Sequence, residues 1–217
     1  RQRLFVLMLA GAMLVLAAVL SLSVGATGLS LESVPDAVAG LFGSTDAVST
    51  RAALVLVEIR LPRTVLAAMV GASLAVAGAM MQGLFRNPLA DPGLVGVSSG
   101  AALAAVSVIV LGHGIAAPIV GPLGPHALPV AAFAGGLAIT GALVLLAGGR
   151  RSVSIAALLL AGLVIGALAQ ALMGLIAYVS DDRELRDITL WTLGSLAGAS
   201  WTKVIGVAPI ELINMAY

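Results

Sequence analysis

Residues 60–105 read RLPRTVLAAMVGASLAVAGAMMQGLFRNPLADPGLVGVSSGAALAA. The segment contains two long apolar runs, at 64–85 and 93–112, and a short polar turn with two prolines lies between them. A transmembrane helix needs about 20 mostly apolar residues. Both runs reach that length, so the segment predicts two membrane-spanning helices joined by a tight turn.

The composition of the whole chain is also that of a membrane protein. Of its 217 residues, 60% are hydrophobic and 10% are charged, whereas a soluble domain has about 45–50% and 25%. Together with a mean hydropathy of +1.14, these values exclude a soluble domain and a disordered chain. The chain has no cysteine for a disulfide, thiolate metal site or nucleophile. Its net charge of +1 argues against nucleic-acid binding, which needs a basic patch.

Three further runs are long enough to cross a bilayer, at 4–25, 127–149 and 153–179. The run at 4–25 exceeds the apolar region of a signal peptide, which is about 7–15 residues long, so we expect it to be retained as a membrane anchor. A sixth apolar stretch begins near Trp201 and reaches only Tyr217. The sequence therefore predicts an all-α membrane protein, with five full spans and the start of a sixth.

Two prolines indicate where helices begin. Pro62 precedes the second span at a position that the first helical turn tolerates. Asp91 followed by Pro92 resembles an N-cap and a first-turn proline, which would open the third span.

The distribution of charges favours a cytoplasmic N-terminus. Lysine and arginine set the orientation of membrane proteins, but with this topology the arginines are evenly divided between the two sides. The charged residues of the short inner turns are arginines, apart from Asp91. The longer outer loops contain eight of the ten acidic residues. We therefore expect the N-terminus inside.

Glycine and alanine recur every four residues on several spans, as in Gly96, Gly100 and Ala104. Small residues at this spacing let helices approach closely in lipid, and such a surface also suits helices that slide during gating. Gln170 interrupts the stripe of the fifth span. Because polar groups in lipid need partners, we expect it to bond another helix or to line a substrate pathway.

No ionisable residue lies at the centre of any predicted span. Proton-coupled carriers use intramembrane acids or histidines as relays, so this pattern argues against such a carrier. It argues equally against an intramembrane hydrolase with an acid or histidine base.

Two segments closely resemble the FecCD family of transport permeases, which serve ABC importers of iron chelates, haem and cobalamin. One is the 60–105 segment, with RLPR, VGASLAVAGAMMQ and RNPLADPGLVGVSSGA, and the other is DITLWTLGSLAGASW at 187–201. The sequence GLFRNPLADPGLVGVSSGAAL most closely resembles the haem-importing branch of the family.

The resemblance implies the helical fold of a type II ABC importer permease, with about ten spans per subunit. It also implies a homodimer, two cytoplasmic ATPase subunits that bind ATP and magnesium, and an external substrate-binding protein. We therefore expect residues 1–217 to form a single transmembrane permease domain, about the N-terminal half of the family's architecture, in an incomplete chain. The expected location is the bacterial inner membrane.

The resemblance also suggests roles for two motifs. Arg60 and Arg63 would meet acidic side chains of the binding protein, although arginines there could equally be interfacial anchors. The turn containing Asn87, Pro88, Asp91 and Pro92 would lie on the cytoplasmic side, where it fixes two helix ends or acts as a hinge beside the ATPase.

On the outer side we expect a charged loop at 181–187 and then a short half-helix at 188–200 that lines a vestibule. Its residues Trp191, Gly194 and Ser195 join Gln170 as candidates for the pathway. Interfacial placement would also explain a tryptophan here. His113 and His126 flank a loop rich in proline and glycine, and they are candidates for transient haem contact, although loop histidines could equally be solvated.

The expected function is that of a permease that moves haem or a related iron chelate, without catalysis or a bound cofactor or metal of its own. Ferric siderophore or cobalamin is the alternative substrate. A secondary transporter or channel is the alternative outside the ABC class.

Overall fold

The computed structural model describes residues 2–23, 35, 47–146 and 155–216, and the description below refers to these residues. They form two compact units, residues 1–76 with 196–217 and residues 77–195. The predicted all-helical fold is confirmed, and the prediction of one transmembrane domain over 1–217 stays a prediction.

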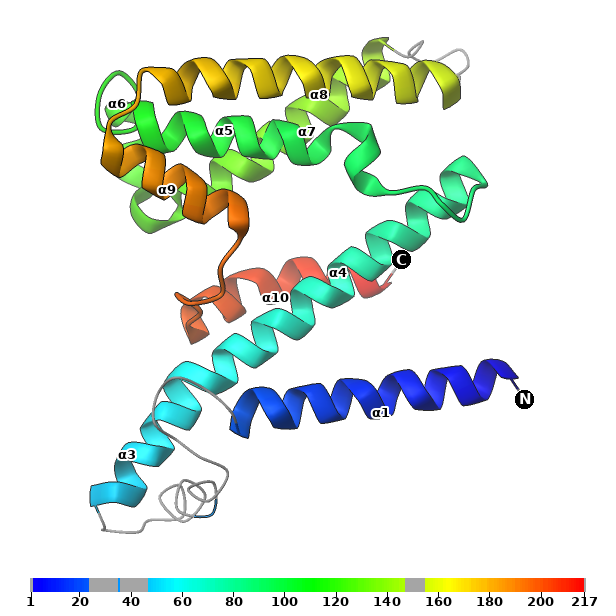
Figure 1. The fold of residues 1–217 in the computed structure, drawn as a ribbon, viewed down its shortest axis with the longest axis vertical. Helices are drawn as coiled ribbons and strands as arrows, with labels where there is room; N and C mark the ends of the chain where they lie inside the picture. Colours follow the sequence, from blue (N-terminus) through cyan, green and yellow to red (C-terminus); the bar gives the residue numbers. More distant parts are fainter. Residues whose placement is uncertain (1, 24–34, 36–46, 147–154, 217) are drawn as a thin grey trace. The chain divides into compact units, whose positions relative to one another are not determined.

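The first unit contains α1 (Gln2–Ser23) and most of a long helix, whose residues from Ala77 onward belong to the second unit (Figure 1). The long helix consists of α3 (Ala47–Val55), the π-helical turn η2 (Leu56–Arg60) and α4 (Leu61–Phe85). α10 (Trp201–Ala216) completes the unit. The apolar side chains of α1 are exposed almost all round, from Leu4 to Leu20. Such a surface suits lipid rather than water.

We predicted that Pro62 would lie at the beginning of a helix. It lies instead inside the long helix that α3, η2 and α4 form. The reason is the π-helical register before it, in which the Leu61 N–H donates to the Leu56 carbonyl five residues earlier. In that register the Val57 carbonyl would face position 62, where proline has no N–H. The indole Nε1 of Trp201 donates to this carbonyl instead, over 3.0 Å.

Trp201→Phe should therefore lower the free energy of unfolding by about 1 kcal/mol, because the part-buried Val57 carbonyl would lose its donor. In a Pro62→Ala background the new N–H can reach the Val57 carbonyl, so the same substitution should cost less. Thermal unfolding of the four proteins in detergent measures this coupling. If Trp201→Phe lowered the free energy of unfolding equally in the two backgrounds, the indole hydrogen bond would not be replacing the N–H that Pro62 lacks.

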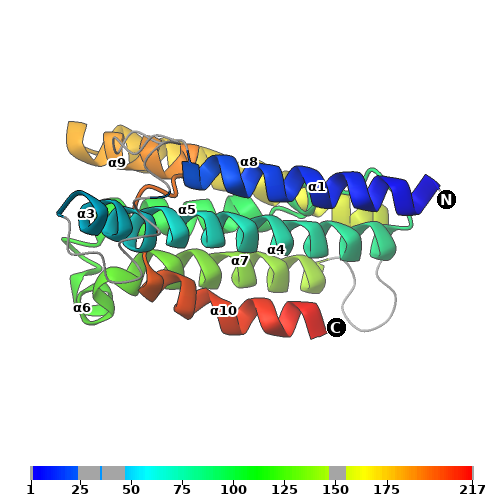
Figure 2. The same cartoon turned by 90° about the horizontal axis from the view of Figure 1, so that it is seen from below.

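The second unit is built on α5 (Val97–Leu111), which contacts both α7 (Ala127–Leu146) and α8 (Ile155–Tyr178) (Figures 1 and 2). The short helices α6 (Ala117–Val120) and η4 (Gly121–His126) connect α5 to α7, and α9 (Asp182–Leu193) follows α8. Phe85, Val95 and Leu143 form a small buried cluster.

Glycine allows α5 and α7 to approach closely. A Cβ on Gly100 would lie 2.6 Å from the Gly135 carbonyl oxygen, and a Cβ on Gly135 would lie 2.4 Å from the Gly100 carbonyl oxygen. Neither atom could be added without moving a backbone. The close packing predicted for the stripe through Gly100 is therefore confirmed, whereas Gly71 and Gly83 on α4 have no neighbour within 4 Å of such a Cβ.

The third span differs most from the prediction of a helix over 93–112. Its α-helix is α5, only 15 residues long, and the 3-10 turn η3 (Pro92–Val95) precedes it. Gly96 separates the two with a φ of +77°, a left-handed conformation that interrupts the helix and favours glycine. Helices α1, α7 and α8 match the predicted spans closely, and positions 24–25, 147–149 and 153–154 of those spans lie outside the described residues.

Candidate functional site

The helix α9 begins where we predicted a charged loop. The Asp181 side chain accepts from the Glu184 N–H over 2.7 Å, and the Glu184 side chain accepts from the Asp181 N–H over 3.1 Å. This reciprocal pair is a capping box, which satisfies two backbone donors at a helix N-terminus. The prediction of a loop at 181–187 is therefore wrong, because the charged residues form the first turns of α9.

Gly194 ends α9 with a φ of +74° and a ψ of 140°, a conformation that L side chains rarely adopt. Its N–H donates to the Trp191 carbonyl, and the chain then turns away from the helix. The half-helix predicted over 188–200 is therefore displaced toward the N-terminus, and residues 194–200 follow it without helical structure.

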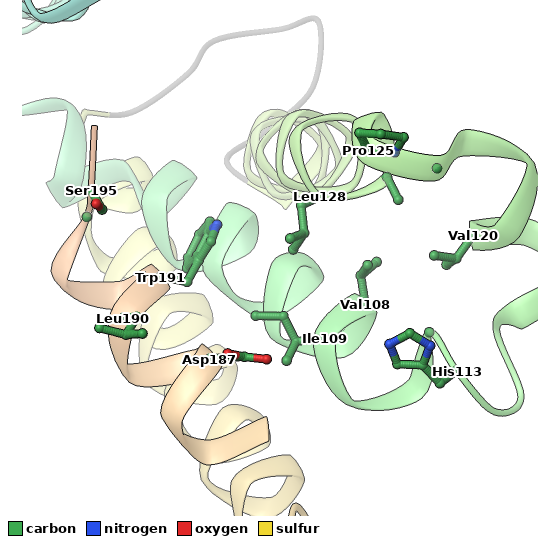
Figure 3. A pocket seen from close by; sticks show the side chains of 14 residues that line it. Val108, Ile109, His113, Val120, Pro125, Leu128, Asp187, Leu190, Trp191 and Ser195 are labelled. Carbon is green, nitrogen blue, oxygen red and sulfur yellow. The ribbon is translucent and has the colours of Figure 1, made fainter. Parts of the chain in front are cut away.

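A pocket of about 650 Å³ lies between α9, the end of α5 and the start of α7, wholly within the second unit (Figure 3). Ligand sites usually have about 300–1,000 Å³. Its walls are mainly apolar. The lining residues are Val108, Ile109, Gly112, His113, Val120, Gly124, Pro125, Ala127, Leu128, Asp187, Leu190, Trp191, Gly194 and Ser195.

The pocket contains four of the predicted site residues, Trp191, Gly194, Ser195 and His113. The predicted His126 and Gln170 do not line it, and both are exposed. None of these placements tests the predicted contact with substrate, which stays a prediction for all six residues.

Sequence reasoning missed Asp187 as a residue of the pocket. It lies one helical turn before Trp191, so both side chains share a face of α9 and enter the pocket from the same wall (Figure 3). The spacing of Asp181 and Glu184 was the available signal, because a capping box there predicts a helix. A helix would have placed Asp187 and Trp191 on the same face.

Among the described residues that line the pocket, Asp187 carries the acidic side chain and none is lysine or arginine. In the described parts of the chain, no group of three or more His, Cys, Asp or Glu residues is placed to hold a metal ion. The pocket therefore offers a carboxylate, an imidazole and an indole in an apolar setting.

The predicted turn between α4 and η3 is present in the second unit. The Asn87 side chain accepts from the Leu89 N–H over 2.9 Å, and the Asp91 side chain accepts from the Gly93 N–H over 2.6 Å. Asp91 therefore caps the 3-10 turn rather than α5, with Pro92 in the first position of that turn. These bonds give the turn a defined shape, and its cytoplasmic placement stays a prediction.

The two arginines of the RLPR motif, Arg60 and Arg63, differ in their surroundings. Arg60 is only 5% exposed, and its guanidinium donates to the Leu22 carbonyl in the last turn of α1. The carbonyls of a last turn lack donors within the helix, and a cation there is favourable. Arg63, in contrast, is exposed. The docking prediction for the pair is untested, and the burial of Arg60 leaves Arg63 as the better candidate.

The long exposed apolar helices define a helical integral membrane protein, and its second unit contains a pocket of ligand size. Residues 13–217 match the FecCD transport family. The chain belongs to this family, which confirms the resemblance of its two motifs.

Two curated relatives have related transport roles. The chain is 46% identical over 155 residues to the hemin transport system permease protein HmuU of Yersinia pestis, which covers 71% of this chain and 45% of the relative. It is 42% identical over 168 residues to the vitamin B12 import system permease protein BtuC of Salmonella paratyphi A, covering 76% of this chain and 49% of the relative. The matched part spans about half the length of these relatives.

A solved structure has the same fold. It is an inward-facing conformation of a metal-chelate type ABC transporter, with a TM-score of 0.74 and 31% sequence identity. The match covers 96% of this chain and 59% of that one. The relatives are transport permeases, in agreement with the expectation that the chain is not an enzyme.

Proposed function

We propose that the chain is part of the permease subunit of an ATP-driven importer that moves haem or a related metal chelate across the bacterial inner membrane. The observation that carries the proposal is the match to the FecCD family over residues 13–217. The greater identity to the hemin permease than to the cobalamin permease favours haem. Ferric siderophores and cobalamin are the alternative substrates.

The chemistry of the spans supports a transport subunit that is driven by its partners. The helices α7 and α8 contain no Asp, Glu, Lys, Arg or His, so they offer no acid or histidine to relay a proton. The energy would come from two ATPase subunits that bind ATP and magnesium. The permease would work as a homodimer with two packings of similar energy, which nucleotide and binding protein bias in turn.

Arg63 is the residue of the first unit that we propose for docking an external binding protein, with the N-terminus of the chain in the cytoplasm. Its guanidinium is exposed and can pair with a carboxylate in a bidentate manner. Charges at the rim of an interface act mainly on the association rate and its dependence on salt.

Arg63→Glu should therefore slow association with the binding protein by about tenfold at low salt, and the difference should shrink as salt is added. Surface plasmon resonance on the assembled importer measures the association rates of the wild-type and variant proteins at each salt concentration. Arg51→Glu, an exposed arginine of α3 outside the RLPR motif, is the control and should have a smaller effect. Unchanged association of Arg63→Glu at every salt concentration would remove this residue from the docking surface.

The substrate is tested by the ATPase activity of the purified importer. Binding protein is loaded in turn with haem, a ferric siderophore and cobalamin, and we expect the haem-loaded form to stimulate hydrolysis most. Stimulation by cobalamin alone or siderophore alone would assign the substrate to that class instead.

A further inference from the structure

The pocket beside α9 lies at the ends of two helices of the second unit, α5 and α7. α7 has 20 residues, enough to cross the hydrocarbon core, and begins at Ala127. Both Ala127 and Gly112, which follows the last residue of α5, line the pocket. The ends of α5 and α7 therefore meet here, and because α7 is long enough to cross the hydrocarbon core, we expect its start to lie near the lipid headgroups.

The walls of the pocket are chemically divided. Val108 and Ile109 of α5 and Leu128 of α7 form an apolar side (Figure 3). Asp187 and Trp191 enter from α9, and His113 enters from the turn after α5. An occupant that is apolar at one end and charged at the other would match these walls.

The charged end of the occupant would be an ammonium group. The Asp187 carboxylate accepts hydrogen bonds from an ammonium, and the electron-rich face of an indole such as Trp191 attracts cations. The described lining residues include no lysine or arginine to occupy the carboxylate from within the pocket. An anionic headgroup would be repelled by Asp187.

The opposite wall offers a donor for a phosphate. A neutral imidazole carries one N–H donor and a charged one carries two, so His113 can donate to a phosphate oxygen in either state. In Figure 3 the His113 ring and the Asp187 carboxylate belong to different elements that border the same space. The pocket thus presents an acceptor for a cation and a donor for an anion.

We propose that this pocket binds the phosphoethanolamine headgroup of a membrane phospholipid. The ammonium lies at Asp187 and Trp191, the phosphate lies at His113, and the start of an acyl chain lies along Val108, Ile109 and Leu128. The occupant would support α9 from its pocket-facing side. The proposal does not depend on which substrate the importer carries.

The test compares lipid binding to the intact importer by native mass spectrometry. We expect phosphatidylethanolamine to bind about tenfold more tightly than phosphatidylglycerol, the change that loss of one charge-assisted hydrogen bond would give. Asp187→Asn should remove this preference, and Asp187→Glu should retain most of it. Asp182→Asn, on the same helix but outside the pocket, should leave it intact.

Two outcomes would overturn the proposal. Equal binding of the two lipids to the wild-type protein would show that the pocket does not select an ammonium headgroup. Binding of soluble glycerophosphoethanolamine as tight as that of the lipid would show that a free solute, rather than a lipid, is the ligand. Circular dichroism of each variant establishes that the helices are retained.

Discussion

Gly100→Leu should separate α5 from α7 and lower the stability of the protein more than the other substitutions considered above. Even a single Cβ at this position would lie 2.3 Å from Cγ1 of Ile139 and 2.6 Å from the Gly135 carbonyl oxygen. Backbone cannot move aside as a flexible side chain can. Overpacking costs about 1–3 kcal/mol for small additions and occasionally more, and the much larger leucine against backbone should exceed this range.

A matched pair on α7 tests the same contact. Gly135→Ala places a Cβ against the Gly100 carbonyl, whereas Gly141→Ala adds one in open space. The first should destabilise the protein. The second should be neutral or stabilising by up to about 1 kcal/mol, because alanine favours helix more than glycine. Thermal unfolding in detergent measures both, and equal losses of stability would contradict the close contact of α5 with α7.

Arg60→Ala should lower the free energy of unfolding by about 1.5–3 kcal/mol, the usual value of a hydrogen bond to a charged group. Its guanidinium donates to the Leu22 carbonyl, so its loss removes a connection between α1 and η2. A second connection, the hydrogen bond of 2.8 Å between the Ser21 and Thr64 hydroxyls, would remain. We therefore expect increased protease access to the end of α1 rather than loss of the whole fold.

Arg63→Ala is the control for this prediction, because Arg63 is exposed three residues further along the chain. It should leave the unfolding temperature unchanged while it slows docking of the binding protein. The two arginines of one motif thus have opposite expected phenotypes. If Arg60→Ala were as stable as wild type, the bond to Leu22 would not contribute to folding.

The spans were predictable because long uncharged runs have one stable solution in a bilayer. The predicted limits of the fifth span are 153 and 179, and α8 extends from Ile155 to Tyr178. The interior of the long helix was not predictable in this way. Pro62 is accommodated by a donor from Trp201, which is distant in sequence, and no local pattern reveals such a contact.

The site was predicted less completely than the spans. Trp191, Gly194 and Ser195 were found through resemblance to a family motif, whereas Asp187 became visible only with the helix that pairs it with Trp191. The capping residues Asp181 and Glu184 had a recognisable spacing. The high charge of this segment nevertheless led us to predict a solvated loop, whereas the capping hydrogen bonds stabilise a helix.

Uptake into proteoliposomes that contain the complete importer tests the central proposal most directly. Haem-loaded binding protein is added outside, with ATP, a non-hydrolysable analogue or no nucleotide inside, and a proton gradient is imposed in a separate arm. We predict uptake only with hydrolysable ATP and binding protein together. Uptake driven by the proton gradient without ATP would contradict the proposal and identify a secondary transporter.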